Sequence, residues 1–400
     1  MFRRLARLVI PRPLRDRVRP IVFRAEYARR DAERDQAIAE ERRRSGEHAA
    51  LLRSLMGREP WCVDTVALEG NMLTFSGWAI APGGDTTAVT FTVSDRLPER
   101  VDYPLPSEDV HKIFWYLPQA SRARFSCRME LTAPESSQPL ALKLVTTSTL
   151  KPLDEGQNYY YLPPALDTLP MPDAAKRQRV VASESESGFL TEGFTTYIKL
   201  DKALERTFGH GLGRFKHVLD WGCGCGRVTR YLDRDGGSIT GADIDGESVH
   251  WCRQNLAFAN FEHIPLHPPT SIASGSFDLV LGISVFTHLS ERDEHQWLAE
   301  LQRIALPGAV LLMSVHADST MSRLSLPVDV IRSWKATGFL DLGANRGLAE
   351  VLTGSETEYY RDTYHTVPYI RENWARYFEI VDIVPEYIGN LQDLVIMRKA

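Results

Sequence analysis

A glycine-rich turn and nearby aspartates stand in the C-terminal half of the 400-residue chain. An apolar run typical of a strand ends in Gly222, Gly224 and Gly226, and a helical pattern follows. Glycines suit such a turn because the backbone must bend tightly and approach a ligand without a Cβ in the way. Asp243 ends the next predicted strand, 21 positions after Gly222, near the ~20 expected for a carboxylate that binds ribose hydroxyls. The pattern predicts a nucleoside-binding site.

Two details favour S-adenosylmethionine over a nicotinamide dinucleotide as the ligand. The glycines run G-x-G-x-G, whereas the dinucleotide fingerprint runs G-x-G-x-x-G. Asp220 also stands two residues before the first glycine. Because no pyrophosphate has to be held, the third dinucleotide glycine has no role. A nucleotide-sugar oxidoreductase is the rival interpretation, which a nicotinamide titration tests.

Three histidines could supply a general base for methyl transfer to an oxygen. His288 follows the fourth predicted strand of the sheet and His316 ends the fifth, where parallel strands face ligands. His365 lies in the segment before the final predicted hairpin. An ordinary packed or surface histidine is the alternative for each. Cys223 and Cys225 lack a second ligand pair at zinc spacing, so no metal site is predicted.

Alternating strand and helix patterns surround these residues from position 189 to the C-terminus. Residues 277–283 form an apolar run suited to a central parallel strand. Residues 291–305 predict an amphipathic helix, and 309–315 the next strand. The segment 318–365 is long for a connection, and we expect it to shape the acceptor pocket.

The segment 189–400 resembles class I S-adenosylmethionine-dependent methyltransferases, and within them a bacterial subgroup associated with polysaccharide biosynthesis. This resemblance covers roughly half of the chain. The residues that carry it are Gly222–Arg227, Asp243–Asp245, Trp251–Arg253, Ser284–Leu289 and Gln392–Val395.

The resemblance implies an α/β Rossmann-like sheet of seven strands that ends in an antiparallel hairpin, here 378–384 and 394–398. It implies that Asp220 and the three glycines face the methionine part of the donor. Asp243 would face the ribose and Ile244 the adenine, and Ser284 is also predicted to bind the donor. Tyr197, on the preceding helix, could close over the donor or pack in the core.

The adenine contact after the third strand stays open. Many relatives have a Gly-Asp pair there, whereas residues 263–269 of this chain read His-Ile-Pro-Leu-His-Pro-Pro. A backbone group is the alternative partner for the adenine amine.

The preceding residues predict three further parts. Residues 1–58 form a basic helical segment with sixteen arginines against eight acidic residues. Residues 61–150 alternate apolar and polar positions, which predicts a small all-β sandwich. Residues 151–188 contain several prolines and a Ser-Glu tract, which indicates a linker.

Composition limits the partners and the compartment. The overall charge is −5, whereas residues 1–58 alone carry a charge of +8, so the remaining residues carry −13. A basic arm on an acidic body argues against nucleic-acid binding by that body. The arm could contact an anionic membrane surface or a protein. No apolar run is long enough to span a bilayer and no signal peptide is visible, and five cysteines suggest no disulfide framework. We expect a cytoplasmic protein, peripheral at the inner membrane face if the arm binds lipid.

The predicted activity is O-methylation of a sugar or glycan precursor, an acceptor implied by the resemblance alone. The alternatives are a methyltransferase that acts on a small molecule or a protein, and a catalytically inactive scaffold that binds the donor.

Overall fold

The computed structural model describes residues 44–233, 237–345 and 358–400. The chain divides into two units, Met1–Arg53 and Ser54–Ala400. Residues 44–55 are helical, whereas most of the predicted basic segment, and with it the predicted membrane or protein contact, lies outside the described residues. No helix in the described parts of the chain combines the length and the apolar character needed to cross a bilayer.

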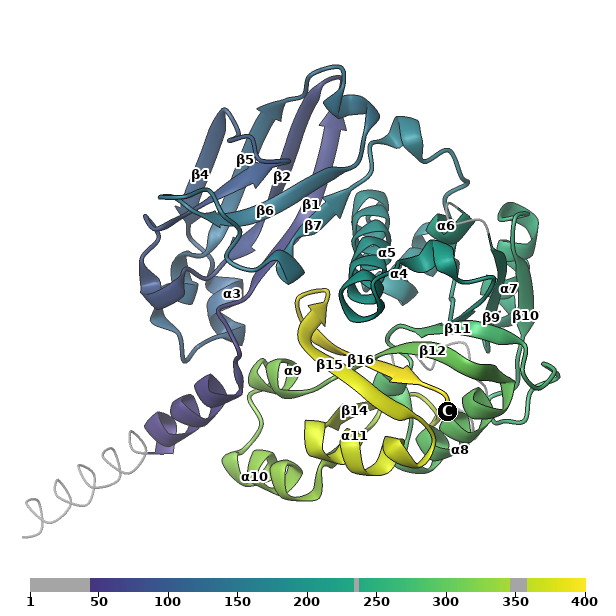
Figure 1. Ribbon diagram of the computed structural model, residues 1–400. Helices are drawn as coiled ribbons and strands as arrows, with labels where there is room; N and C mark the ends of the chain where they lie inside the picture. The colour runs from purple at the N-terminus through teal and green to yellow at the C-terminus, as the bar shows by residue number, and fades with distance from the viewer. Residues whose placement is uncertain (1–43, 234–236, 346–357) are drawn as a thin grey trace, which may run out of the picture. The chain divides into compact units, whose positions relative to one another are not determined.

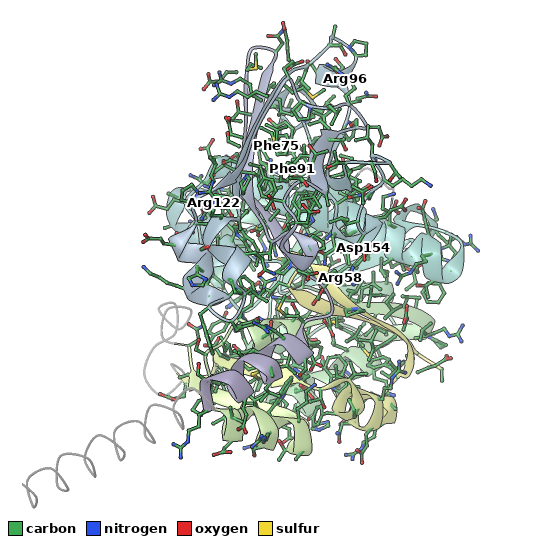
Figure 2. The ribbon with its side chains drawn as sticks, turned by 90° about the vertical axis from the view of Figure 1, so that its left-hand side faces the viewer. Arg58, Phe75, Phe91, Arg96, Arg122 and Asp154 are labelled. Atoms are coloured by element: carbon green, nitrogen blue, oxygen red, sulfur yellow. The ribbon has the colours of Figure 1, made fainter. Side chains whose placement is uncertain are left out.

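Two antiparallel sheets form the N-terminal part of the second unit, here called the β region (residues 61–161; Figure 1). Both sheets contribute to one hydrophobic core, in which three phenylalanines are almost completely buried: Phe75, Phe91 and Phe125. Figure 2 labels Phe75 and Phe91. The larger sheet has the order β1-β2-β5-β4 and the smaller β3-β6-β7. Their bounds are Trp61–Glu69 (β1), Met72–Ala79 (β2), Val89–Val93 (β3), Arg100–Leu105 (β4), Arg124–Glu130 (β5), Leu140–Thr146 (β6) and Tyr159–Tyr161 (β7).

The C-terminal part contains the predicted seven-stranded sheet, in the order β10-β9-β8-β11-β12-β16-β15. The pairs from β10 to β12 are parallel, whereas β16 is antiparallel to both β12 and β15. This topology confirms the Rossmann-like methyltransferase fold. The bounds are His217–Trp221 (β8), Ser238–Asp243 (β9), Asn260–His263 (β10), Phe277–Gly282 (β11), Ala305–Val315 (β12), Glu379–Ile388 (β15) and Gln392–Arg398 (β16).

Helices cover both faces of this sheet because its strands are apolar on both sides. Alternate strand residues pack against α5 (Glu186–Phe208) and α6 (Thr229–Leu232) on one face. The intervening residues pack against α8 (Glu291–Ile304) and α11 (Val367–Asn373) on the other. A strand buried on both faces requires the continuous apolar runs that the sequence contains.

The structure differs from the predicted linker at 151–188. β7 pairs with β6, so the β region continues to residue 161. Helix α4 (Ala174–Val181) follows, and the Asp173 side chain caps it by accepting a hydrogen bond from the Lys176 amide. The Ser-Glu tract contains the cap of α5, because Ser185 accepts a hydrogen bond from the Gly188 amide. The prolines and serines that indicated a linker therefore separate and cap short elements.

The long connection after β12 is also structured where it is described. It contains α9 (Asp318–Ser322), α10 (Val328–Thr337) and the antiparallel strands β13 (Phe339–Ala344) and β14 (Arg361–His365).

Candidate donor and acceptor site

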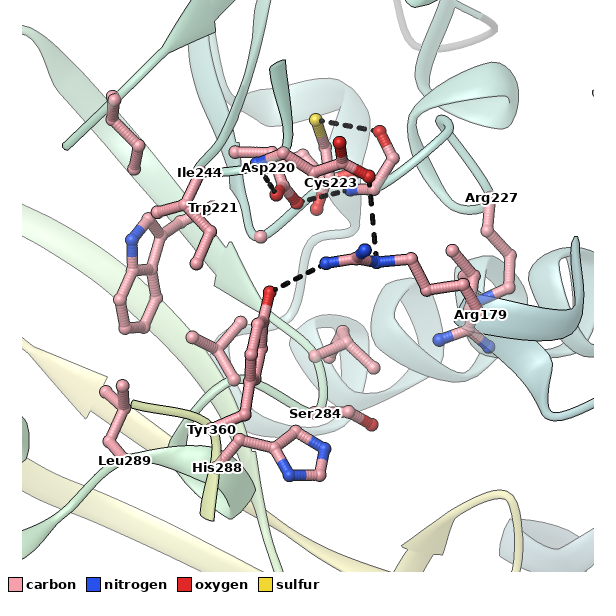
Figure 3. A pocket seen from close by; sticks show the side chains of 18 of the residues that line it. Arg179, Asp220, Trp221, Cys223, Arg227, Ile244, Ser284, His288, Leu289 and Tyr360 are labelled. Atoms are coloured by element: carbon pink, nitrogen blue, oxygen red, sulfur yellow. Dashed lines mark hydrogen bonds and ion pairs between the residues drawn. The ribbon is translucent and has the colours of Figure 1, made fainter. Parts of the chain in front are cut away.

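A cavity lies at the carboxyl ends of β8, β9 and β11, where an open α/β sheet binds its ligands. It encloses about 1000 Å³ of empty space, including its open mouth. Figure 3 shows side chains from the sheet, from α4 and from the segment before β14 pointing into this space. Of the predicted site residues, the lining includes Asp220, Gly222, Gly224, Asp243, Ile244, Ser284 and His288.

The glycine turn is shaped by positive φ angles and by close neighbours. Gly222 (φ 76°) and Gly224 (φ 52°) adopt conformations that side chains rarely take. A Cβ on Gly222 would also overlap the neighbouring Val285 side chain. Gly226 (φ 77°) does not line the cavity, and a Cβ there would overlap Leu256. Two of the three predicted glycines therefore form the cavity wall, and the third allows the turn to pack on its neighbours.

Asp220 is a buried carboxylate at the end of β8. Its side chain accepts a 2.5 Å hydrogen bond from the Thr229 hydroxyl, and only 3% of the residue is exposed. Burial raises the pKa of Asp220 to about 6, opposed by the Thr229 hydrogen bond and by the charge of Arg227. A cationic group bound beside Asp220 would favour its charged form.

Asp243 holds the glycine turn against β9. Its Oδ2 accepts a 2.7 Å hydrogen bond from the Gly224 amide, and its Oδ1 accepts a 2.8 Å bond from the Asp245 amide. Burial raises the pKa of Asp243, and these two amides oppose the shift. Each carboxylate oxygen has a second lone pair, so ribose hydroxyls can still donate to it.

These carboxylate acceptors and the apolar walls fit S-adenosylmethionine. Asp220 would take the cationic methionine part, and Asp243 the ribose hydroxyls. Ile244 and Ile264 line the same cavity and offer an apolar surface for the adenine. Residues 264–269, which follow β10, include no acidic side chain. The Ile264 amide donates to the Asp243 carbonyl, and the backbone alternative for the adenine amine stays a prediction.

Ser284 lines the cavity in a strained backbone conformation, with φ 61°. Its amide donates to the Ser314 hydroxyl at 2.7 Å, and its own hydroxyl donates to Gln392 Oε1 at 3.1 Å. A non-glycine residue with positive φ costs about 1–3 kcal/mol and is concentrated at functional sites. β12 and β16 thus fix the turn that follows β11.

His288 is the predicted base that reaches the cavity, and its tautomer is fixed. Its Nδ1 lies 2.9 Å from the Arg361 carbonyl oxygen. Because a carbonyl only accepts, Nδ1 carries the proton in the neutral ring and the Nε2 lone pair is left for an acceptor. Burial lowers the pKa of His288 below its usual 6.5, opposed by this carbonyl and by Asp362. The ring is therefore neutral at pH 7, as a base must be.

The structure does not bring the other two predicted bases to the cavity wall. His316 lies behind His288, with ring centroids 6.2 Å apart, and stacks on Tyr364. Burial lowers the pKa of His316 to about 3. His365 is fully buried, and its Nε2 lies 2.5 Å from Glu294 Oε2. This geometry gives His365 a structural contact between β14 and α8.

Sequence reasoning missed an arginine and a tyrosine that close one side of the cavity. Arg179, on α4, donates to the Tyr360 hydroxyl at 3.1 Å and lies 3.6 Å from Asp245 (Figure 3). Their signal was weak because they come from the predicted linker and from the long connection. Arg227, a further cavity-lining cation, pairs with Glu192 at 3.4 Å.

Tyr197 belongs to the core. It packs against Phe194 and Tyr231, with ring centroids 6.0 Å away in each pair, and is absent from the cavity lining among the described residues. Tyr360, and not Tyr197, is a tyrosine that lines the cavity.

The two cysteines of the turn are buried free thiols. Burial raises the pKa of Cys223 well above its usual value and that of Cys225 to about 12, which keeps both thiols protonated. No cluster of metal-ligating side chains occurs among residues 44–233, 237–345 and 358–400.

Comparison with known proteins agrees with this geometry. A family profile described as "Methyltransferase domain" matches residues 219–313. Ribosomal protein L11 methyltransferase of Burkholderia thailandensis is 30% identical over 223 residues, which span 55% of this chain and 69% of that protein.

Two further relatives share shorter segments. Malonyl-[acyl-carrier protein] O-methyltransferase of Enterobacter lignolyticus is 35% identical over 31% of this chain and 45% of its own length. The O-antigen chain terminator bifunctional methyltransferase/kinase WbdD of Escherichia coli is 29% identical over 33% of this chain and 20% of its own length. The chain spans less than half the length of these two relatives. The topology, the glycine turn and the match across two thirds of a relative agree, and the chain belongs to the class I S-adenosylmethionine-dependent methyltransferase family.

Proposed function

We propose that this protein transfers the methyl group of S-adenosylmethionine to a hydroxyl of a sugar or glycan precursor. The observation that carries the proposal is one cavity lined by Asp220, Asp243 and a neutral His288. Two carboxylates suit the donor, and the Nε2 lone pair of the histidine suits the proton of an acceptor hydroxyl. The resemblance to the O-antigen enzyme WbdD over a third of this chain supports the glycan acceptor.

The residues would divide the reaction between positioning and proton removal. When bound, the donor would supply an electrophilic methyl group on a sulfonium, and breaking its S–CH3 bond would release the neutral thioether S-adenosylhomocysteine. The glycine turn and the two carboxylates hold the donor, and Tyr360 with Arg179 excludes water from one side. His288 Nε2 takes the acceptor proton while its Nδ1–H stays bonded to the Arg361 carbonyl. Alignment of the reacting groups contributes most of the rate, and the base adds about 10²–10⁴-fold.

The test is methyl transfer from isotope-labelled donor to a panel of sugars, nucleotide-sugars and lipid-linked saccharides. We expect label on a hydroxyl oxygen of at least one saccharide, and little transfer by His288→Ala protein that still binds the donor. Transfer only to a small molecule or to a protein would contradict the glycan acceptor and favour the corresponding alternative. Donor binding without any transfer favours the inactive scaffold.

A cytoplasmic location, with the basic N-terminal segment against the inner membrane face, is part of this proposal. It rests on the arginine content of residues 1–58.

A further inference from the structure

A second cavity lies beside the donor cavity, between the β region and the methyltransferase fold. It encloses about 690 Å³ of empty space, including its mouth. Strand β1 forms one wall, and the opposite wall comes from the end of α4 and the first turns of α5. The β region thus contributes directly to a cavity next to the reaction site.

The two cavities share a wall. Val180 lines the donor cavity and Val181 lines the second one. Glu192, in the second cavity, lies 3.4 Å from Arg227, which lines the first. A Cβ on Gly193 would overlap the Arg227 carbonyl oxygen, so α5 contacts the glycine turn without a side chain between them. A molecule in the second cavity therefore lies within one side-chain layer of the donor site.

A bulge in β1 shapes the wall that the β region contributes. The pairing with β2 shifts between Val63 and Thr65, which leaves Asp64 as the extra residue. A Cβ on Gly77 would overlap the Cys62 carbonyl, so glycine is required opposite the bulge. Arg124 pairs with Asp64 and fixes its carboxylate. The bulge thus places Asp64 and Thr65 in succession along the cavity.

The lining is rich in hydroxyl and carboxylate groups and has no cationic side chain. Its polar members are Cys62, Asp64, Thr65, Ser183, Thr191 and Glu192, and the rest are valines and one glycine. Carboxylates accept hydrogen bonds from neighbouring hydroxyls. Both carboxylates of the lining are already paired with arginines, Asp64 with Arg124 and Glu192 with Arg227, so the lining offers no unpaired charge to an ionic ligand. Val63 and Val66 pack in the core of the β region, so Val181 is the valine that can contact C–H groups of a ligand. This chemistry suits an uncharged ligand with many hydroxyls.

One buried group in the lining lacks a partner. The Thr191 hydroxyl has no hydrogen bond in the described structure although the residue is only 4% exposed. A buried polar group without a hydrogen bond is costly, so a partner from outside the chain would be stabilising. Thr191 and Glu192 both line the cavity from α5, so two different hydroxyls of one ligand can contact them.

We propose that this second cavity binds a neutral saccharide unit of the acceptor, remote from the hydroxyl that is methylated. The inference rests on the proposed function, since it takes the acceptor to be a glycan. It assigns the β region a role in acceptor recognition, with Asp64, Thr191 and Glu192 as the residues that contact sugar hydroxyls.

Saturation-transfer NMR on the full chain tests the proposal with glucose, galactose, mannose, lactose and maltose at millimolar concentration. We expect transfer to at least one of these sugars, and little to glucuronate or glucose 1-phosphate. Thr191→Val and Asp64→Asn should each weaken sugar binding by about tenfold, the loss expected for a hydrogen bond to a buried or charged group. Thr74→Val, on the neighbouring strand β2 and outside the cavity lining, should not.

Donor titration of the same proteins separates this inference from the proposed function. All three variants should bind S-adenosylhomocysteine as the wild type does. Failure of the wild type to bind the donor product would count against the function itself. If the donor product binds normally, three outcomes overturn this inference and leave the proposed function intact. They are that no neutral sugar binds, that the cavity variants bind sugar unchanged, or that only an amine such as spermidine is bound.

Discussion

The imidazole of His288 differs from the two neighbouring histidines in what its nitrogens contact. Its Nδ1 faces the Arg361 carbonyl, and its ring lines the donor cavity with no partner at Nε2 among the described residues. His365 instead uses Nε2 for Glu294. Sequence position alone did not separate them, because all three lie near the end of a strand: His288 after β11, His316 after β12 and His365 at the end of β14. What distinguishes them is which ring nitrogen is hydrogen-bonded to the surrounding protein and which is left for a ligand.

Replacement of His288 by Gln should therefore reduce catalysis without reducing donor affinity. The variant loses the base, so we expect kcat to fall by about 10²–10⁴-fold, with a donor Kd within about twofold of the wild type. His316→Gln, one ring further from the cavity, is the matched control and should retain most activity. Equal losses in the two variants would contradict the assignment. Single-turnover methyl transfer and calorimetric donor titration provide the two readouts.

Donor affinity should depend on pH through Asp220. Burial raises its pKa to about 6 in the absence of ligand, and a cationic donor binds the charged carboxylate. Protons therefore compete with the donor, and the Kd should rise as the pH falls below about 6. Asp220→Asn should bind weakly at every pH, with this dependence removed. Calorimetry between pH 5 and pH 8 checks the prediction, and a pH-independent Kd in the wild type would refute it.

The cavity residues at the ends of the sheet strands could be predicted from sequence, whereas Arg179 and Tyr360, which close one side of the cavity, could not. Asp220, Gly222 and Asp243 stand at strand ends whose pattern fixes both their spacing and their edge of the sheet. Arg179 and Tyr360 reach the same cavity from α4 and from the long connection after β12. Their approach depends on tertiary packing, which no local pattern encodes.

At the scale of elements, the contact between α5 and the glycine turn depends on Gly193. A Cβ there would overlap the Arg227 carbonyl oxygen and approach the Tyr231 ring at 3.1 Å. Since the overlapped atom is backbone, it cannot move aside as a flexible side chain would. The donor cavity therefore keeps its shape only while α5 stays close to the turn.

Gly193→Ala should lower the free energy of unfolding by about 1–3 kcal/mol, the usual cost of overpacking a core, and weaken donor binding. Gly188→Ala is the matched control on the same helix, because its Cβ would meet only ordinary contacts with Ser185. Alanine is the better helix former, so this control should be neutral or slightly stabilising. Urea denaturation of both variants measures the difference. Equal free energies of unfolding for the two variants would show that α5 does not pack closely against the glycine turn at Gly193.

The elements of the C-terminal half followed from their patterns, and those of the middle did not. The helix predicted at 291–305 ends one residue earlier, at Ile304. Its amphipathic stripe was long enough to define it. Helix α4 has only eight residues and β7 only three. Such short elements carry too few periodic positions to stand out from the prolines around them.

At the scale of the whole molecule, a buried lysine joins the β region to the methyltransferase fold. Lys199 Nζ donates to the Tyr387 carbonyl at 2.8 Å and to Asn390 Oδ1 at 2.6 Å. Asn390 Nδ2 in turn donates to the carbonyls of Trp61 and Gln157, both from the β region. The tip of the β15–β16 hairpin is thereby fixed between α5 and the β region (Figure 1). Nothing in the local sequence marks Lys199 for this role.

Stability should rise with pH because of Lys199. Burial lowers its pKa from 10.5 to about 7, so the unfolded chain binds a proton that the folded chain has lost between these values. The free energy of unfolding should increase from about pH 7 to pH 10, by a few kcal/mol at most. Lys199→Met should lack this increase, whereas Lys202→Met, exposed on the same helix, should retain it. Urea denaturation across this pH range would contradict the assignment if all three proteins gave parallel curves.

The most direct test of the donor site is calorimetric titration with S-adenosylmethionine and S-adenosylhomocysteine. Asp243→Asn should weaken binding at least about tenfold, since a carboxylate that accepts ribose hydroxyls is lost. Asp278→Asn is the matched control, because Asp278 also accepts two backbone amides, from Lys216 and His217, at the opposite edge of the sheet. We predict saturable binding to the wild type and the control, reduced in Asp243→Asn alone. No binding by the folded wild type, or equal losses in both variants, would contradict the assignment of this cavity to the methyl donor.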